Sequence, residues 1–233
     1  MILYHMDRSG CFPTSGELSL HPLSDLPHDI AASRFFLDFQ SGVSKHCLNY
    51  FTDSASMLIA IQSMPLGQLF VAADSLAAAN RRISSQLIEL TVELVRRQLF
   101  PHYPSRLISL FAVEQISDFK KWGLEHAEQA RVFQISAPDN LKRFDARHLR
   151  GGITFTTDET GTYCGCLLTA MYDQAIKYWS CEPSADPLWE YLVPLPAQLH
   201  QVLLCDKTSL ASIDGIRNAS LSLPQNQAEC SDP

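Results

Sequence analysis

The chain has 233 residues, 46% of them hydrophobic, so it is long enough to bury a full core and is predicted to form one compact domain or one domain with a helical insertion. A net charge of −7 argues against nucleic-acid binding, because phosphate recognition needs a clustered excess of Lys and Arg. The basic pairs at 81–82, 96–97 and 120–121 are scattered along the chain.

No targeting, membrane or metal signal is readable. The first residues lack a basic segment followed by a long apolar run, and no stretch is long enough to span a bilayer. The seven cysteines are irregularly spaced, without a Cys-x-x-Cys pair, which favours buried or surface thiols in a reducing cytoplasm. Cys164 and Cys166 lack a second ligand pair at suitable spacing, so no metal site is predicted.

The chain opens with a predicted strand and a loop. Residues 2–5 are β-rich and stop at a turn-forming cluster over 7–10. A second turn over 13–18 precedes a run with spaced leucines. Residues 42–46 form a Gly-Ser loop that either lies over a ligand or only connects two elements.

Two helices are predicted in the middle of the chain. Thr52 or Asp53 caps the first, through Ile61, and Asp74 caps the second, Ser75 to Leu99. A four-residue ion pair, Glu93 with Arg97, lies on the side opposite the core face. The spacing of three and four residues assigns this core face to Leu76, Ala79, Ile83, Leu87, Leu90 and Leu94.

The remaining predicted elements are a mixture of strands and helices. Strands are predicted at 105–113, 130–136 and 199–204, a capped helix at 117–123, a short helix at 141–149 and a longer helix at 167–179. Residues 186–194, bracketed by Pro187 and Pro194, form a strand in which Trp189, Tyr191 and Val193 share one face and Glu190 and Leu192 the other.

Three stretches of this pattern resemble ADP-ribosyltransferases. Leu3-Tyr4-His5 with the following Asp-Arg and Pro-containing loop resembles the opening strand of that family, residues 105–113 its middle motif, and the Glu190 strand its last catalytic strand. The run E-x-V-R-R-x-x-F-P-x-x-P-S-R-x-x-S-L-F-A at 93–112 is also similar to a poorly characterised group of bacterial proteins with this fold.

The resemblance implies an α+β fold with an ADP-ribosyltransferase-like split antiparallel β-sheet core. The core would form a single domain over 1–219, with a helical insertion at about 50–100 and a polar tail at 220–233 that is too hydrophilic to fold.

The resemblance also implies the site residues. Glu190 would be the catalytic carboxylate, and His5, Arg8, Arg106, Ser109 and Phe111 would bind NAD. Leu110-Phe111 replaces the usual Thr-Ser of the middle motif; Phe111 would stack on the nicotinamide or belong to the core. His5 would bond a ribose or a backbone group. Asp145 would follow the middle motif, and Glu182 and Asp186 would contact the acceptor or lie in a solvated loop.

The function implied is transfer of ADP-ribose from NAD to a protein, without a metal, by a bacterial effector or toxin. Leu188 stands where transferases that modify arginine carry a second acid, which argues against an arginine acceptor. Another side chain, such as threonine of host ubiquitin, or a small molecule stays open as the acceptor. The enzyme would be made in the bacterial cytoplasm and delivered to the host cytosol. The alternative is an inactive module of the same fold that binds a host or partner protein.

Overall fold

The computed structural model describes residues 1–7, 12–13, 16–52, 73–123, 131–150, 155–157, 163–166 and 168–204. Arg8, residues 53–72 of the expected insertion and the expected tail at 220–233 lie outside this part of the chain. The strands are β1 (Ile2–Asp7), β2 (Gly16–Leu18), β3 (Ser109–Ala112), β4 (Arg131–Ser136), β5 (Arg143–Asp145), β6 (Phe155–Thr157), β7 (Tyr163–Cys166), β8 (Trp189–Pro194) and β9 (Ala197–Leu204). The α-helices are α1 (His28–Ala31), α4 (Ala73–Leu99), α5 (Asp118–Lys121) and α6 (Leu168–Trp179), with 3-10 turns η1 (Leu23–Asp25), η2 (Arg34–Phe39), η3 (Arg106–Ile108) and η4 (Ala146–Leu149).

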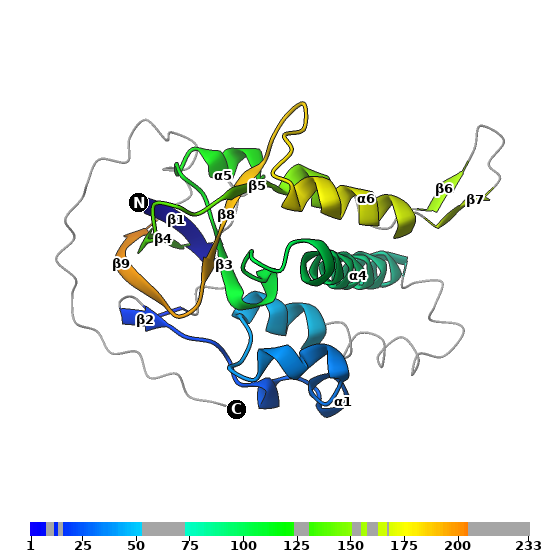
Figure 1. The fold of residues 1–233 in the computed structure, drawn as a ribbon, viewed down its shortest axis with the longest axis horizontal. Helices are drawn as coiled ribbons and strands as arrows, with labels where there is room; N and C mark the ends of the chain where they lie inside the picture. Colours follow the sequence, from blue (N-terminus) through cyan, green and yellow to red (C-terminus); the bar gives the residue numbers. More distant parts are fainter. Residues whose placement is uncertain are drawn as a thin grey trace.

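The strands form antiparallel sheets, and the predicted α+β class is confirmed. One sheet has the order β1-β4-β9-β2 and the other the order β3-β8-β5, while β6 and β7 form a separate hairpin. Tyr4 and Val113 join the two larger sheets through a pair of backbone hydrogen bonds of 2.8 Å. This bridge sets the middle of β1 beside the end of β3 (Figure 1).

Residues 190–193 of β8 are buried, and their side chains alternate between two faces as predicted. Tyr191 and Val193 belong to the core between the two sheets, with Leu3 and Phe133. Leu192 belongs instead to a second core, under α4 and α6. The helices cover one side of this sheet, and α4 and α6 lie next to each other (Figure 1). Glu190 points to the helical side with Leu192.

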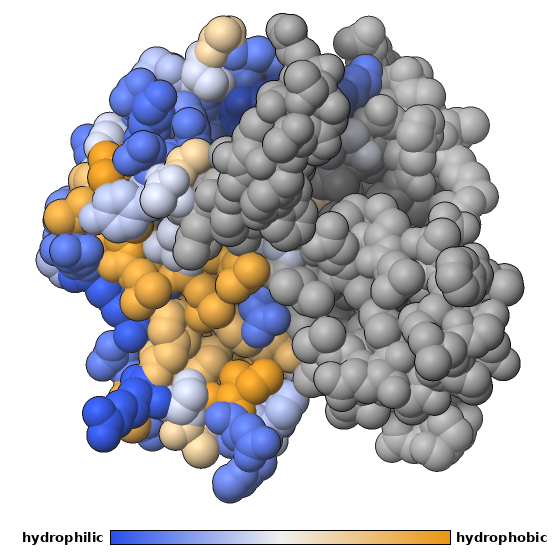
Figure 2. Space-filling model, turned by 90° about the vertical axis from the view of Figure 1, so that its right-hand side faces the viewer, coloured by the Kyte–Doolittle hydropathy of each residue, from blue (hydrophilic) through white to orange (hydrophobic). Residues whose placement is uncertain are grey.

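The expected core face of α4 is wrong at Leu87 and Leu94; Leu90 is half-buried against a core cluster, and the side chains of Leu76, Ala79 and Ile83 lie outside the described part of the chain. Leu87 and Leu94 are exposed, and the buried positions are one residue further on, a rotation of about 100° around the helix. The inward face carries Ser84, Ile88, Glu89, Val92, Glu93 and Val95. On the surface, Figure 2 shows hydrophobic residues gathered on the described part of the face that it presents. The prediction used hydrophobicity alone and so placed the leucines in the core. In the structure the two glutamates are buried instead, because groups distant in the sequence satisfy their carboxylates.

Three local predictions also need correction. Residues 105–108 do not extend β3, because the Ser105 hydroxyl accepts from Leu107 N at 3.1 Å and starts the η3 turn. The segment 141–149 is strand β5 followed by η4 instead of one helix. Asp74 lies inside α4 and not before it. The predicted elements α5, β4, α6, β8 and β9 are present, with shifted ends.

The expected loop over 42–46 is the start of a helix over residues 45–52. Ser44 Oγ accepts from Cys47 N at 3.2 Å, which makes Ser44 the N-cap, and Ser44 N donates to Leu107 O at 2.8 Å. Thr52, which was expected to cap a helix through Ile61, therefore lies in the helix over 45–52. Gly42, with φ of 109°, makes the turn that brings this helix against η3.

Within the described residues, no helix combines the length and the apolarity needed to cross a bilayer.

Replacing Gly42 tests this turn. A Cβ at Gly42 would lie 2.3 Å from the His21 carbonyl oxygen, in addition to the strain of a positive φ. We expect Gly42→Ala to lower the free energy of unfolding by about 2 kcal/mol or more, measured by urea denaturation. Gly123→Ala is the matched control, since Gly123 has φ of 66° and no atom within 4 Å of the added Cβ, so only about 1 kcal/mol should be lost. Equal losses would contradict the close approach.

Candidate functional site

A cavity of about 350 Å³ lies where β1, β3 and β8 meet the helix over 45–52 and α5. This volume is at the lower end of the range of small-molecule sites. Its lining consists of His5, Met6, Asp7, Phe12, Lys45, His46, Asn49, Tyr50, Arg106, Ser109, Leu110, Phe111, Ala112, Val113, Phe119, Trp122, Arg150 and Glu190.

The floor of the cavity is a buried charge network around Arg106. Its Nε and Nη2 donate to the two oxygens of Glu89, at 2.9 and 3.0 Å, and Nη1 pairs with Glu190 Oε1. Nη1 also donates to the hydroxyl of Tyr178 at 2.7 Å, and that hydroxyl donates to Glu190 Oε1 at 2.7 Å. Glu89, Arg106 and Glu190 are 4%, 6% and 2% exposed, so this network is shielded from water.

The chain positions Arg106 through a second network next to the first. Glu93 on α4 accepts from Ser105 Oγ at 2.7 Å and is also paired with Arg96 and Arg97. The predicted Glu93–Arg97 pair is therefore present, but Glu93 is fully buried. Because Ser105 caps η3, its bond to Glu93 fixes the turn from which Arg106 extends.

The pKa values of the two carboxylates that share Arg106 shift in opposite directions. Burial alone would raise the pKa of Glu89, but the charge of Arg106, with its hydrogen bonds and the nearby His46, lowers it to about 2. For Glu190, burial dominates and raises the pKa, although Arg106 and Tyr178 oppose it. Burial also raises the pKa of Tyr178, so its hydroxyl stays protonated. Glu89 therefore stays charged beside Arg106, and Glu190 is the carboxyl group that burial makes easier to protonate.

The walls are aromatic rings and two histidines. His5 Nδ1 lies 2.8 Å from the Phe111 carbonyl oxygen, so this nitrogen carries the proton, and its ring stacks on Phe12. Phe111 lies against the guanidinium of Arg106, at 4.4 Å, and meets His46 edge to face. His46 is turned with Nε2 3.7 Å from Glu89 Oε1. These contacts hold both imidazoles in fixed orientations.

Basic groups lie at the outer part of the cavity. Lys45 is half-buried on the helix over 45–52. Arg150 donates to the Trp122 carbonyl at 3.0 Å and lies over its ring at 5.2 Å. Asp7, which accepts from Phe12 N and pairs with Arg131, is the acid on this side. The cavity thus runs from an acidic floor to a more basic, aromatic opening.

The structure brings together all the predicted site residues that it describes. The cavity is lined by His5, Arg106, Ser109, Phe111 and Glu190, although these residues are spread over 186 residues of sequence, from 5 to 190. Arg106 lies on η3 and not on the strand, and its donors bond the two carboxylates. The Ser109 hydroxyl donates to the Ser105 carbonyl at 2.7 Å and so has a structural bond.

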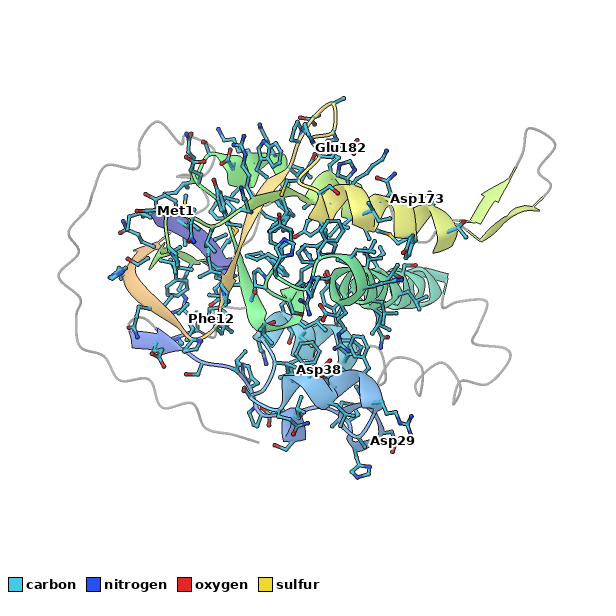
Figure 3. All side chains as sticks on the ribbon, viewed as in Figure 1. Met1, Phe12, Asp29, Asp38, Asp173 and Glu182 are labelled. Carbon is cyan, nitrogen blue, oxygen red and sulfur yellow. The ribbon has the colours of Figure 1, made fainter. Side chains whose placement is uncertain are left out.

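The other acids named from sequence lie elsewhere. Asp145 is fully buried and accepts backbone hydrogens of Arg147, Ser184 and Leu188, at 2.7 to 2.9 Å, which fixes the start of β8. Glu182 and Asp186 are exposed in the loop between α6 and β8, and neither lines the cavity; Glu182 lies at the outer edge of the molecule (Figure 3).

Sequence reasoning missed Glu89, His46, Lys45 and Tyr178. The available signal for the helix residues was Ser44, a good N-cap directly before them, which places Lys45, His46, Asn49 and Tyr50 on one helical face. Glu89 has no local signal, because its partner Arg106 lies 17 residues away in sequence. Among the described residues, no group of three or more His, Cys, Asp or Glu could hold a metal ion.

The comparisons with known proteins name one family. Residues 32–203 match the model of a family described as "Protein of unknown function (DUF2441)". No curated protein matches the chain. The matched segment contains His46, Glu89, Arg106 and Glu190, whereas His5 lies before it.

Because the pKa of Glu89 is lowered, the stability of the folded protein depends on pH in the acidic range. A depressed pKa in the folded protein adds stability that is complete above the ordinary value of 4.5 and is lost as the pH falls toward about 2. We expect the free energy of unfolding to fall by about 3 kcal/mol more in wild type than in Glu89→Gln over this window. Urea denaturation of both proteins at a series of pH values measures the difference, and parallel curves would contradict the assignment.

Proposed function

We propose that this chain, which belongs to the DUF2441 family of proteins of unknown function, transfers ADP-ribose from NAD to a protein acceptor, with Glu190 as the catalytic carboxylate. The observation that carries the proposal is the meeting of His5, Phe111 and Glu190 in one cavity. They come from the three stretches that resemble the motifs of ADP-ribosyltransferases.

The arrangement of the strands supports this proposal. β3 pairs with β8, so that Phe111 lies opposite Leu192, and the Tyr4–Val113 bridge brings β1 to the other edge of β3. The middle motif therefore lies between the first and the last one. The 2.8 Å contact of His5 with the Phe111 carbonyl ties the first motif to the second.

The chemistry of the cavity suits NAD. Loss of nicotinamide leaves positive charge on the ribose ring, and a carboxylate fixed beside that ring stabilises the transition state more than the ground state. Phe111 and Phe12 offer aromatic surfaces for the nicotinamide, while Lys45 and Arg150 at the opening offer positive charge for the pyrophosphate. His5 Nε2, opposite the protonated Nδ1, is an acceptor for a ribose hydroxyl.

The network below Glu190 sets its charge to respond to NAD. Arg106 and Tyr178 both donate to Oε1, which holds the carboxyl group in place. Burial raises the pKa of this carboxyl group, and a nearby positive charge lowers it. The nicotinamide ring of NAD is a cation, so its binding favours the ionised carboxylate at the moment when the reaction needs it.

The acceptor we propose is a protein side chain other than arginine, with threonine of host ubiquitin as a candidate. The enzyme would then be a bacterial effector that reaches the host cell. Leu188, two residues ahead of Glu190, is 1% exposed and apolar, so it supplies no second acid for a guanidinium. The loop before β8 carries the exposed Glu182 and Asp186; Asp186 pairs with Arg147, and Glu182 faces a protein partner that approaches this loop.

Glu190→Gln is the test of catalysis. The amide oxygen preserves an acceptor for Arg106 and Tyr178 but removes the charge, so we expect nicotinamide release from NAD to fall by about 100-fold or more. Release is measured by chromatography, with thermal unfolding as the check of folding. Asp173→Asn, an exposed acid on α6 remote from the cavity, should keep wild-type release (Figure 3). Equal rates in wild type and Glu190→Gln would favour an inactive module that binds a partner protein.

A further inference from the structure

The proposed transfer leaves one proton without an acceptor. An acceptor hydroxyl, or water in its place, must lose its proton as it bonds to the ribose. Glu190 cannot take this proton and at the same time keep the negative charge that stabilises the ribose cation. Leu188 has no polar group, and the Ser109 hydroxyl already donates to the Ser105 carbonyl. Another group on the cavity wall must act.

His46 has the position and the partner that a base requires. Its ring lines the cavity and its side chain is 25% exposed, while its Nε2 lies 3.7 Å from Oε1 of Glu89, which is 4% exposed. Tyr50 and Phe111 contact the ring edge to face, with centroids at 4.3 and 4.2 Å. A buried carboxylate behind an imidazole stabilises the imidazolium that forms when the ring takes a proton.

Two other groups on the wall are weaker choices. His5 Nδ1 donates to the Phe111 carbonyl, and a neutral carbonyl stabilises an imidazolium less than a carboxylate does. Asp7 is 3% exposed and its Oδ2 already accepts from Phe12 N and Arg131. Of the candidates on the described wall, His46 is the one that faces a buried carboxylate.

We propose that His46 is a catalytic base that deprotonates the acceptor, and that Glu89 is its positioning residue. The inference rests on the proposed transfer reaction and adds a second catalytic group to it. Glu89 then has two roles, because the carboxylate that positions His46 also neutralises Arg106. The acceptor class is then a hydroxyl, which needs a base.

The step balances as a substitution at the ribose carbon. The bond from that carbon to the nicotinamide nitrogen breaks, and its electron pair leaves with the now neutral nicotinamide. The oxygen of the acceptor bonds to the same carbon, and its proton goes to the imidazole of His46. The proton then passes to solvent, and no redox partner is required.

The charges around His46 come from several elements. Glu89 on α4 is the nearest acid, and Arg106 on η3 partly offsets its charge. Lys45 and Tyr50 lie on the same helix as His46, and Glu190 and His5 line the same cavity. The imidazolium therefore depends mainly on Glu89.

Hydrolysis of NAD with water as the acceptor tests the base. We expect His46→Ala to lower kcat for nicotinamide release by about 100-fold, with KM for NAD nearly unchanged. Added imidazole should restore release in His46→Ala but not in Glu190→Gln, because only the first variant lacks a base. Thermal unfolding checks both variants.

The Glu89 pairing has a readout that does not depend on activity. The titration midpoint of the His46 ring, followed by proton NMR and assigned by loss of the signal in His46→Gln, should fall by about one pH unit or more in Glu89→Gln. The exposed pair of His28 with Asp29 gives an internal reference that should not move.

The outcomes separate the two proposals. If Glu190→Gln abolishes release while His46→Ala keeps the wild-type kcat, the base assignment is wrong and the transfer reaction stands. An unchanged His46 midpoint in Glu89→Gln would overturn the positioning role of Glu89. If wild type releases no nicotinamide, or Glu190→Gln releases it at the wild-type rate, the proposed function fails and the inference fails with it.

Discussion

The structure depends on a guanidinium that cannot lose its proton. Arg106 is 6% exposed, and burial of a permanent charge costs several kcal/mol unless it is paired. Glu89, Glu190 and the hydroxyl of Tyr178 meet it from α4, β8 and α6, so this one side chain joins four elements. The helices cannot shift relative to β8 without breaking a buried ion pair. The need to neutralise Arg106 thus places the acids of the site.

Two acids around one base also give the cavity its electrical character. Glu89 binds Arg106 through both oxygens and its lowered pKa keeps it charged, so the positive charge is already balanced before Glu190 is counted. Ionised Glu190 makes the floor negative by one charge; burial raises the pKa of this carboxyl group, and the charge of Glu89 raises it further. Such a floor favours a cation in front of it. An oxocarbenium ion and a nicotinium ring both meet that requirement.

The sequence predicts the strands well and the buried charges poorly, for a physical reason. Alternation along β8 is a local property, and it placed Glu190 and Leu192 on the correct face. The face of α4 is decided by partners outside the helix: Glu89 and Glu93 are buried because Arg106 and Ser105 satisfy them, while Leu87 and Leu94 remain exposed. Hydrophobic periodicity cannot reveal such bonds, so the predicted face is off by one residue.

The same limit applies to the site. Glu190, His5 and Phe111 were found through resemblance of short strands, each of which carries its own motif. Glu89 and His46 have no such motif, and only the fold places them beside Arg106 and Phe111. Glu93 extends this dependence further, because it holds Ser105, which starts the turn that carries Arg106. A substitution of Glu93 in α4 therefore acts on Glu190 through Ser105 and Arg106. The long helix supports the site and also sets the positions of its charged groups.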